Sequence, residues 1–90
     1  MKILWDEESW RDLNSFLING DKKSYRKIIS LIDDIDKNGV DKGIGKPEAL
    51  KYNLSGLYSR EINEKDRLVY KIDESGNLRI LQCKTHYDKA

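Results

Sequence analysis

The stretch LYSREINEKDRLVYKIDESGNLRILQC, residues 57–83, decides the fold. Leu68 and Tyr70 fall on one face of an alternating pattern that is typical of a half-buried strand. Two short polar segments, 64–65 and 74–77, predict tight turns on either side of that strand. We therefore predict an antiparallel meander of about three strands, at residues 57–63, 67–73 and 78 to about 86.

The first half of the chain predicts a short strand at residues 2–5, followed by two helices. Asp6 and Asp21 are suitable N-caps, because their carboxylates can accept hydrogen bonds from free helix amides. Hydrophobic residues recur at helical spacing at Trp10, Leu13 and Leu17, and then at Tyr25, Ile28, Ile29, Ile32 and Ile35. Asn19-Gly20 and Asn38-Gly39 are expected to end the helices. The predicted fold class is α+β, in a single domain of residues 1–90, with the helix hairpin packed on one face of the sheet.

Composition narrows the function classes. The chain has 90 residues, of which 38% are hydrophobic and 37% charged, with a net charge of +1. Seven Lys/Arg and nine Asp/Glu give residues 1–41 a charge of −2, whereas ten and seven give residues 42–90 a charge of +3. A polyanion site is therefore expected in the second half. We expect no signal peptide or membrane span, because acidic residues interrupt the N-terminal apolar run.

The cysteine and histidine counts exclude other kinds of site. The one cysteine, Cys83, cannot form an internal disulfide, which suits a cytoplasmic protein. With a single histidine as well, the chain cannot supply a structural zinc site, and we expect no metal or other cofactor. We interpret Cys83 as a small buried hydrophobe that shares strand parity with Leu81, rather than as a nucleophile.

Several polar residues could perform chemistry on RNA. A carboxylate, several cations and an imidazole are the groups needed to transfer protons around a phosphodiester that is attacked by a 2′-hydroxyl. Each residue also has an ordinary interpretation as a solvent-exposed side chain, which is the default in so charged a chain. The candidates are Glu48, Lys51, Arg60, Arg67, His86 and Tyr87.

Five stretches give these candidates a family context. GKPEALKYNLSG (45–56), YSR (58–60), DRLVY (66–70) and CKTHY (83–87), with the opening WDEESW (5–10), closely resemble the YoeB toxins of the RelE/ParE superfamily. The resemblance covers essentially the whole chain. It implies a RelE-like fold and a toxin of a toxin–antitoxin pair, one that cuts messenger RNA on the ribosome and so stops translation.

The resemblance also implies roles for individual residues. Glu48 would be the general base on the 2′-hydroxyl, and His86 the general acid on the leaving 5′-oxygen. Arg67 would stabilise the pentavalent phosphate, and Tyr87 would contact phosphate or stack on a base. The new 3′ end would carry a 2′,3′-cyclic phosphate. Phosphates of the message or of ribosomal RNA would be held by three cations: Lys46, Lys51 and Arg60.

Two residues depart from the family pattern. A second basic residue commonly follows the position of Arg60, but here it is Glu61. A histidine or another neutral-to-basic residue often precedes the position of Arg67, but here it is Asp66. Both changes lower the local positive charge, so they bear on auxiliary RNA binding rather than on the acid–base pair.

The implied partners are a cognate, YefM-like antitoxin with an acidic, partly disordered segment, the 70S ribosome and its message. DNA would be contacted only through the antitoxin complex, no membrane is implied, and a homodimer is allowed. Two other functions stay open: a non-enzymatic toxin of the same fold that inhibits gyrase, as in the ParE branch, and an antitoxin-binding co-repressor. The presence of Glu48, Arg67 and His86 together favours the ribonuclease.

Overall fold

The computed structural model describes residues 1–85. Within that range the chain forms two α-helices, one short 3-10 helix and one five-stranded sheet. In chain order the elements are β1 (Ile3–Trp5), α1 (Glu7–Ile18), α2 (Lys22–Asn38), β2 (Glu48–Ala49), η1 (Tyr52–Leu54), β3 (Tyr58–Glu61), β4 (Arg67–Ile72) and β5 (Leu78–Gln82).

The sheet has the order β1-β5-β4-β3-β2, and its antiparallel meander confirms the predicted α+β fold. The short strand β1 pairs in parallel with the last strand, β5, at one edge. At the other edge β2, which the sequence did not suggest, pairs with β3 in antiparallel fashion. The predicted last strand is too long: β5 ends at Gln82 rather than near His86.

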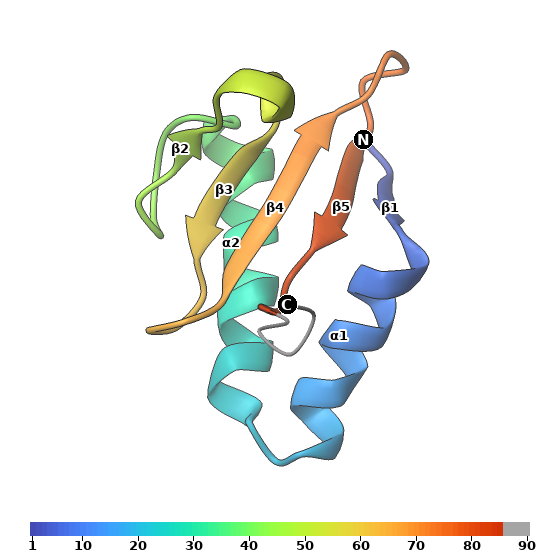
Figure 1. The fold of residues 1–90 in the computed structure, drawn as a ribbon, viewed down its shortest axis with the longest axis vertical. Coiled ribbons are helices and arrows are strands. Elements are labelled where there is room, and N and C mark those ends of the chain that lie inside the picture. Colours follow the sequence, from blue (N-terminus) through green and yellow to red (C-terminus); the bar gives the residue numbers. More distant parts are fainter. Residues whose placement is uncertain (86–90) are drawn as a thin grey trace.

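Both helices cover the same face of the sheet, and the other face is open (Figure 1). The two helices run in opposite directions, as a hairpin should. Between helices and sheet lies a core that contains Ile28 and Leu31 from α2 and Leu68, Tyr70 and Ile80 from the sheet, all with 0% exposure. The alternation along β4 therefore directs Leu68 and Tyr70 towards the helices and Arg67 and Val69 towards the open face.

The helix α1 is rotated relative to its predicted orientation. Of the expected stripe of Trp10, Leu13 and Leu17, only Leu13 is buried, and Trp10 and Leu17 are 52% and 46% exposed. The helix also buries Ser9, Asp12 and Phe16, which the spacing did not predict. The Ser9 hydroxyl donates to the Ile80 carbonyl at 2.7 Å, so a small residue brings α1 close to β5. Trp10 stacks edge-on against Trp5, with ring centroids 6.0 Å apart.

The helix α2 follows its prediction more closely. Asp21 caps it by accepting a hydrogen bond from the Ser24 amide at 3.1 Å, and this bond lowers the pKa of Asp21. Its buried stripe includes Leu31, which the spacing analysis did not include, whereas Ile29 is 45% exposed. Asp6 is the residue before α1, but its carboxylate makes no capping bond.

A β-bulge in β5 explains the position of Cys83. Tyr70 pairs with Ile80 and Val69 with Gln82, so Leu81 is an extra residue in the ladder. The bulge shifts the side-chain alternation by one, and Cys83 enters the core with 0% exposure. Its burial is confirmed, but shared parity with Leu81 is the wrong reason. Burial raises the Cys83 pKa to about 12, which keeps the thiol protonated at neutral pH.

Candidate functional site

The open face of the sheet carries a row of side chains set by strand register. Glu48 of β2 lies opposite Ser59 of β3, Ser59 opposite Val69 of β4, and Val69 opposite Gln82 of β5. Residues directly opposite one another share a face of the sheet. Arg67 lies two residues before Val69 and therefore on this face too. The register thus places the predicted base, Glu48, and the predicted phosphate-binding guanidinium, Arg67, on one face of three neighbouring strands, β2, β3 and β4.

Arg67 is held in place by its neighbours on the open face. Its Nε donates to the Ser59 hydroxyl at 3.0 Å, and its Nη1 lies 3.6 Å from a carboxylate oxygen of Glu61. Its Nη2 is buried and has no hydrogen-bond partner in residues 1–85. A guanidinium nitrogen in this condition is costly, and an anionic oxygen would relieve the cost. Ser59 is the positioning residue that sequence inspection missed.

Two other predicted cations, Lys46 and Lys51, are exposed. Lys46 has a positive φ of 52° in the loop before Pro47, and its Nζ lies 3.4 Å from Glu61. Glu61 therefore bridges Lys46 and Arg67, which orders two cations while it reduces the local charge. Lys51 is exposed and directly precedes η1, three residues after Glu48.

The prediction that Arg60 contacts RNA is wrong, because Arg60 has 0% exposure. Alternation along β3 turns it towards the helices, away from Ser59 and Glu61. Its Nε donates to the Tyr70 hydroxyl at 2.8 Å, and its Nη1 pairs with the Asp34 carboxylate at 2.5 Å. Three carbonyls of the loop after α2 accept its other N–H groups, those of Gly39, Lys42 and Ile44.

The buried Arg60 holds the loop that leads to Glu48. Its hydrogen bond lowers the pKa of Asp34, whose carboxylate also accepts the Ile44 amide at 3.1 Å. The Glu61 amide donates to the Gly45 carbonyl at 2.7 Å, so the loop lies along β3 at this point. Gly45, at φ 80°, could not carry a side chain, since an added Cβ would lie 2.6 Å from Leu31. The clamp therefore sets the path of the chain into β2.

His86 and Tyr87 lie outside the described residues, but the chain that leads to them is anchored beside Arg67. The amide of Thr85 donates to the Asp66 carboxylate at 2.8 Å, and the Thr85 hydroxyl donates to the Lys65 carbonyl at 2.7 Å. Asp66 has 0% exposure and also accepts from the Asn63 amide group at 2.9 Å. Asp66, which departs from the family pattern, is thus bonded within the protein rather than a free surface charge.

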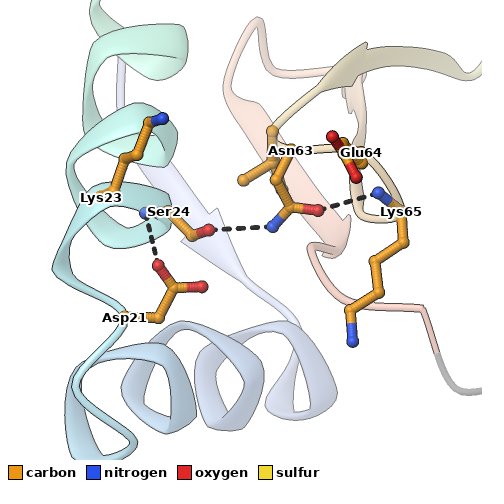
Figure 2. Close-up of a pocket in the computed structure, with 7 residues that line it drawn as sticks. Asp21, Lys23, Ser24, Asn63, Glu64 and Lys65 are labelled. Atoms are coloured by element: carbon orange, nitrogen blue, oxygen red, sulfur yellow. Dashed lines mark hydrogen bonds between the residues drawn. The ribbon is translucent and has the colours of Figure 1, made fainter.

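A hollow of about 550 Å³ lies away from the open face, between the start of α2 and the β3–β4 turn (Figure 2). Asn63 links its two sides, donating to the Ser24 hydroxyl at 2.8 Å and accepting from the Lys65 amide at 3.0 Å. Its charges alternate in sign: Asp21, Lys23, Glu64 and Lys65. None of the predicted site residues that the structure describes lines this hollow, so we do not place the site there.

Residues 1–85 contain no group of three or more His, Cys, Asp or Glu side chains placed to hold a metal ion. No helix among them combines the length and the apolar character that crossing a membrane requires.

Comparisons with known proteins agree with this fold. The model of the YoeB-like toxin of bacterial type II toxin–antitoxin systems matches residues 5–87. The toxin YoeB of Synechocystis sp. is 48% identical over 89 residues, covering 99% of this chain and all of that protein. The toxin in a heterotetrameric YoeB–YefM complex from Staphylococcus aureus is 45% identical, with a TM-score of 0.88, over 97% of this chain and 98% of that one.

A YoeB dimer from the same species superposes with a TM-score of 0.86, again at 45% identity and over 97% and 98% of the two chains. The chain therefore belongs to the YoeB-like toxins of bacterial type II toxin–antitoxin systems.

Proposed function

We propose that this toxin is a ribosome-dependent endoribonuclease that cuts messenger RNA during translation. The observation that carries the proposal is the convergence of Glu48 and Arg67 on Ser59, with one guanidinium nitrogen buried and unpartnered in the described chain. A carboxylate and a fixed planar cation at one point of an open sheet face suit a single scissile phosphodiester.

The reaction uses side chains for proton transfer and charge stabilisation. The Glu48 carboxylate takes the proton of the 2′-hydroxyl, and the 2′-oxygen bonds to phosphorus. Arg67 stabilises the added negative charge on the non-bridging oxygens. The bond from phosphorus to the 5′-oxygen breaks, and His86 gives that oxygen a proton. The products are a 2′,3′-cyclic phosphate and a free 5′-hydroxyl, and no metal is required.

Other residues bind the RNA in this proposal. Tyr87 contacts phosphate or stacks on a base. Lys46, which lies beside Glu61, and Lys51, three residues after Glu48, are both exposed and attract the backbone. Arg60 is not among the RNA-binding residues, because its N–H groups donate to acceptors inside the protein.

The protein partners that we propose for this toxin are those seen in structures of its relatives. The Staphylococcus aureus YoeB was solved in complex with YefM and as a dimer. We infer that this toxin binds a YefM-like antitoxin through an acidic, partly disordered segment, and that it forms a homodimer. It would meet DNA only through that complex, and would act on the 70S ribosome in the cytoplasm.

The test is a cell-free translation reaction with purified protein, followed by mapping of the message ends. We expect cuts that require translation and leave cyclic phosphate. Glu48→Gln and His86→Gln should fold normally and lose cleavage. Glu64→Gln, on the exposed β3–β4 turn, is the matched control and should cut at the wild-type rate. If both site variants cut as fast as the wild type, the proposal is wrong.

A further inference from the structure

The open face carries a cavity of about 360 Å³ beside the Glu48–Arg67 site. This volume is within the range of sites that take small organic groups. Val69 joins the cavity to the site, because it pairs with Ser59 and lies on the same face as Arg67, about 7 Å along the strand. The apolar wall comes from the η1 region and from two strands, through Leu50, Leu54, Leu57, Val69 and Leu81.

The bulge in β5 builds one side of this cavity. Because Leu81 is an extra residue in the ladder, both Leu81 and Gln82 lie against Val69 and line the hollow. A regular strand would have turned one of the two towards the helices. The irregularity therefore adds a second side chain, that of Gln82, to this side of the cavity.

The rim of the cavity is acidic. Asp6 and Glu8, at the start of α1, also line it, and the Asp6 carboxylate is held by Arg79 through hydrogen bonds of 2.8 and 3.2 Å. The five apolar side chains of the wall offer a phosphate no hydrogen-bond donor, so the RNA backbone would not enter. The cavity favours a ligand with an apolar body, and the carboxylate oxygens at its rim can accept N–H groups at that ligand's edge, which is the chemistry of a nucleobase.

We propose that this cavity holds one unstacked nucleobase of the RNA, next to the phosphodiester that lies on Arg67. The inference rests on the proposed ribonuclease function and adds a base-binding subsite to it. Single-stranded RNA is commonly bound with its bases splayed into such pockets. The arrangement separates the two parts of the nucleotide: phosphate goes to the cationic side of the face, and base to the apolar side.

The experiment uses ribosomes bound to synthetic messages, in which one codon has no tRNA bound to it. Each message carries a single abasic nucleotide, and its position within that codon differs from one message to the next. At one position the missing base should slow wild-type cleavage about tenfold, a typical loss for one base contact. Leu54→Ala, at a 46% exposed position, should slow cleavage of the intact message by a similar factor. On the abasic message that variant should lose nothing further, because the same contact is already gone.

Leu81→Ala, on the opposite wall, repeats the measurement, and thermal unfolding confirms that each variant is folded. Ile18→Ala removes an 82% exposed side chain from the far end of α1 and should cut every message like the wild type. The subsite would be overturned if a cavity substitution slowed cleavage of the abasic message as much as it slows cleavage of the intact one. It would also be overturned if no abasic position changed the cleavage rate. Either result would leave the proposed ribonuclease function standing. A wild-type protein that cuts none of the messages overturns the proposed function and the subsite with it.

Discussion

The buried carboxylate of Asp66 ties the start of β4 to the segment that follows β5. It accepts hydrogen bonds from Thr85 and Asn63, and its own amide donates to the Asn63 side chain at 2.8 Å. Its neighbour in sequence is Arg67. The residue therefore links the strand that presents the guanidinium to the chain that continues into His86.

We predict that Asp66→Ala releases residues 83–85 from this anchor. Loss of a buried acceptor typically costs about 1–3 kcal/mol, because its donors lose their partner. Hydrogen exchange at the Thr85 amide should speed up tenfold or more, and message cleavage should fall. Asp73→Ala is the matched control, since Asp73 accepts from the Ser75 and Asn77 amides in the β4–β5 turn at 2.9 Å. Unchanged exchange at Thr85 in Asp66→Ala would contradict the anchor.

At the scale of elements, a buried guanidinium couples β3, β4, α2 and the loop that follows α2. Arg60 reaches Tyr70 on β4, Asp34 on α2 and three loop carbonyls. Such a residue contributes to stability and also sets the course of the loop that ends at Glu48. Breaking it should therefore affect folding and the site together.

We predict that Arg60→Met lowers the free energy of unfolding at pH 7 by about 3–5 kcal/mol, as expected for a buried ion pair that loses one partner. The ion pair lowers the pKa of Asp34 below 3.8, so its stabilisation is complete above that pH and is lost as the pH falls through the folded-state value. The difference between variant and wild type should therefore shrink in acid.

Urea titrations at pH 7 and near pH 3 measure this difference, with Arg11→Met as the control, because Arg11 makes only an exposed pair with Glu7 on α1. A variant as stable as the wild type at pH 7 would show that the Arg60 contacts are not structural.

The elements themselves were largely predictable from the sequence, and their rotations were not. Alternation in β4 predicted the antiparallel strands, and the apolar spacing and terminal glycines of the helices predicted the helix hairpin. Both signals are local in sequence. Burial of Ser9 in place of Trp10 depends on a contact with Ile80, far away in sequence. The inward orientation of Arg60 depends likewise on loop carbonyls that no local pattern reveals. At the site, motif resemblance supplied Glu48 and Arg67, but only the register revealed Ser59.

At the scale of the whole molecule, charge is divided between the halves of the chain, and the second half carries the open-face cations. We predict that binding of single-stranded RNA weakens as salt rises. Lys51→Gln should lower the slope of log K against log salt by about 0.7, the value for one phosphate contact on a single strand.

Lys37→Gln, in the last turn of α2 and paired with Asp33, should leave that slope unchanged. Titrations at several salt concentrations measure both variants. Equal slopes for wild type and Lys51→Gln would mean that Lys51 does not contact the backbone.

The parallel pairing of β1 with β5 has a consequence for synthesis of the toxin. The strand made first can complete its pairing only with the strand made last, and β5 separates it from β4. Such distant pairing is slow to form, since the intervening chain must be in place first. A nascent toxin therefore lacks a finished sheet until residue 82 has left the exit tunnel of the ribosome, so the face that carries Glu48 and Arg67 is completed only after all five strands have emerged.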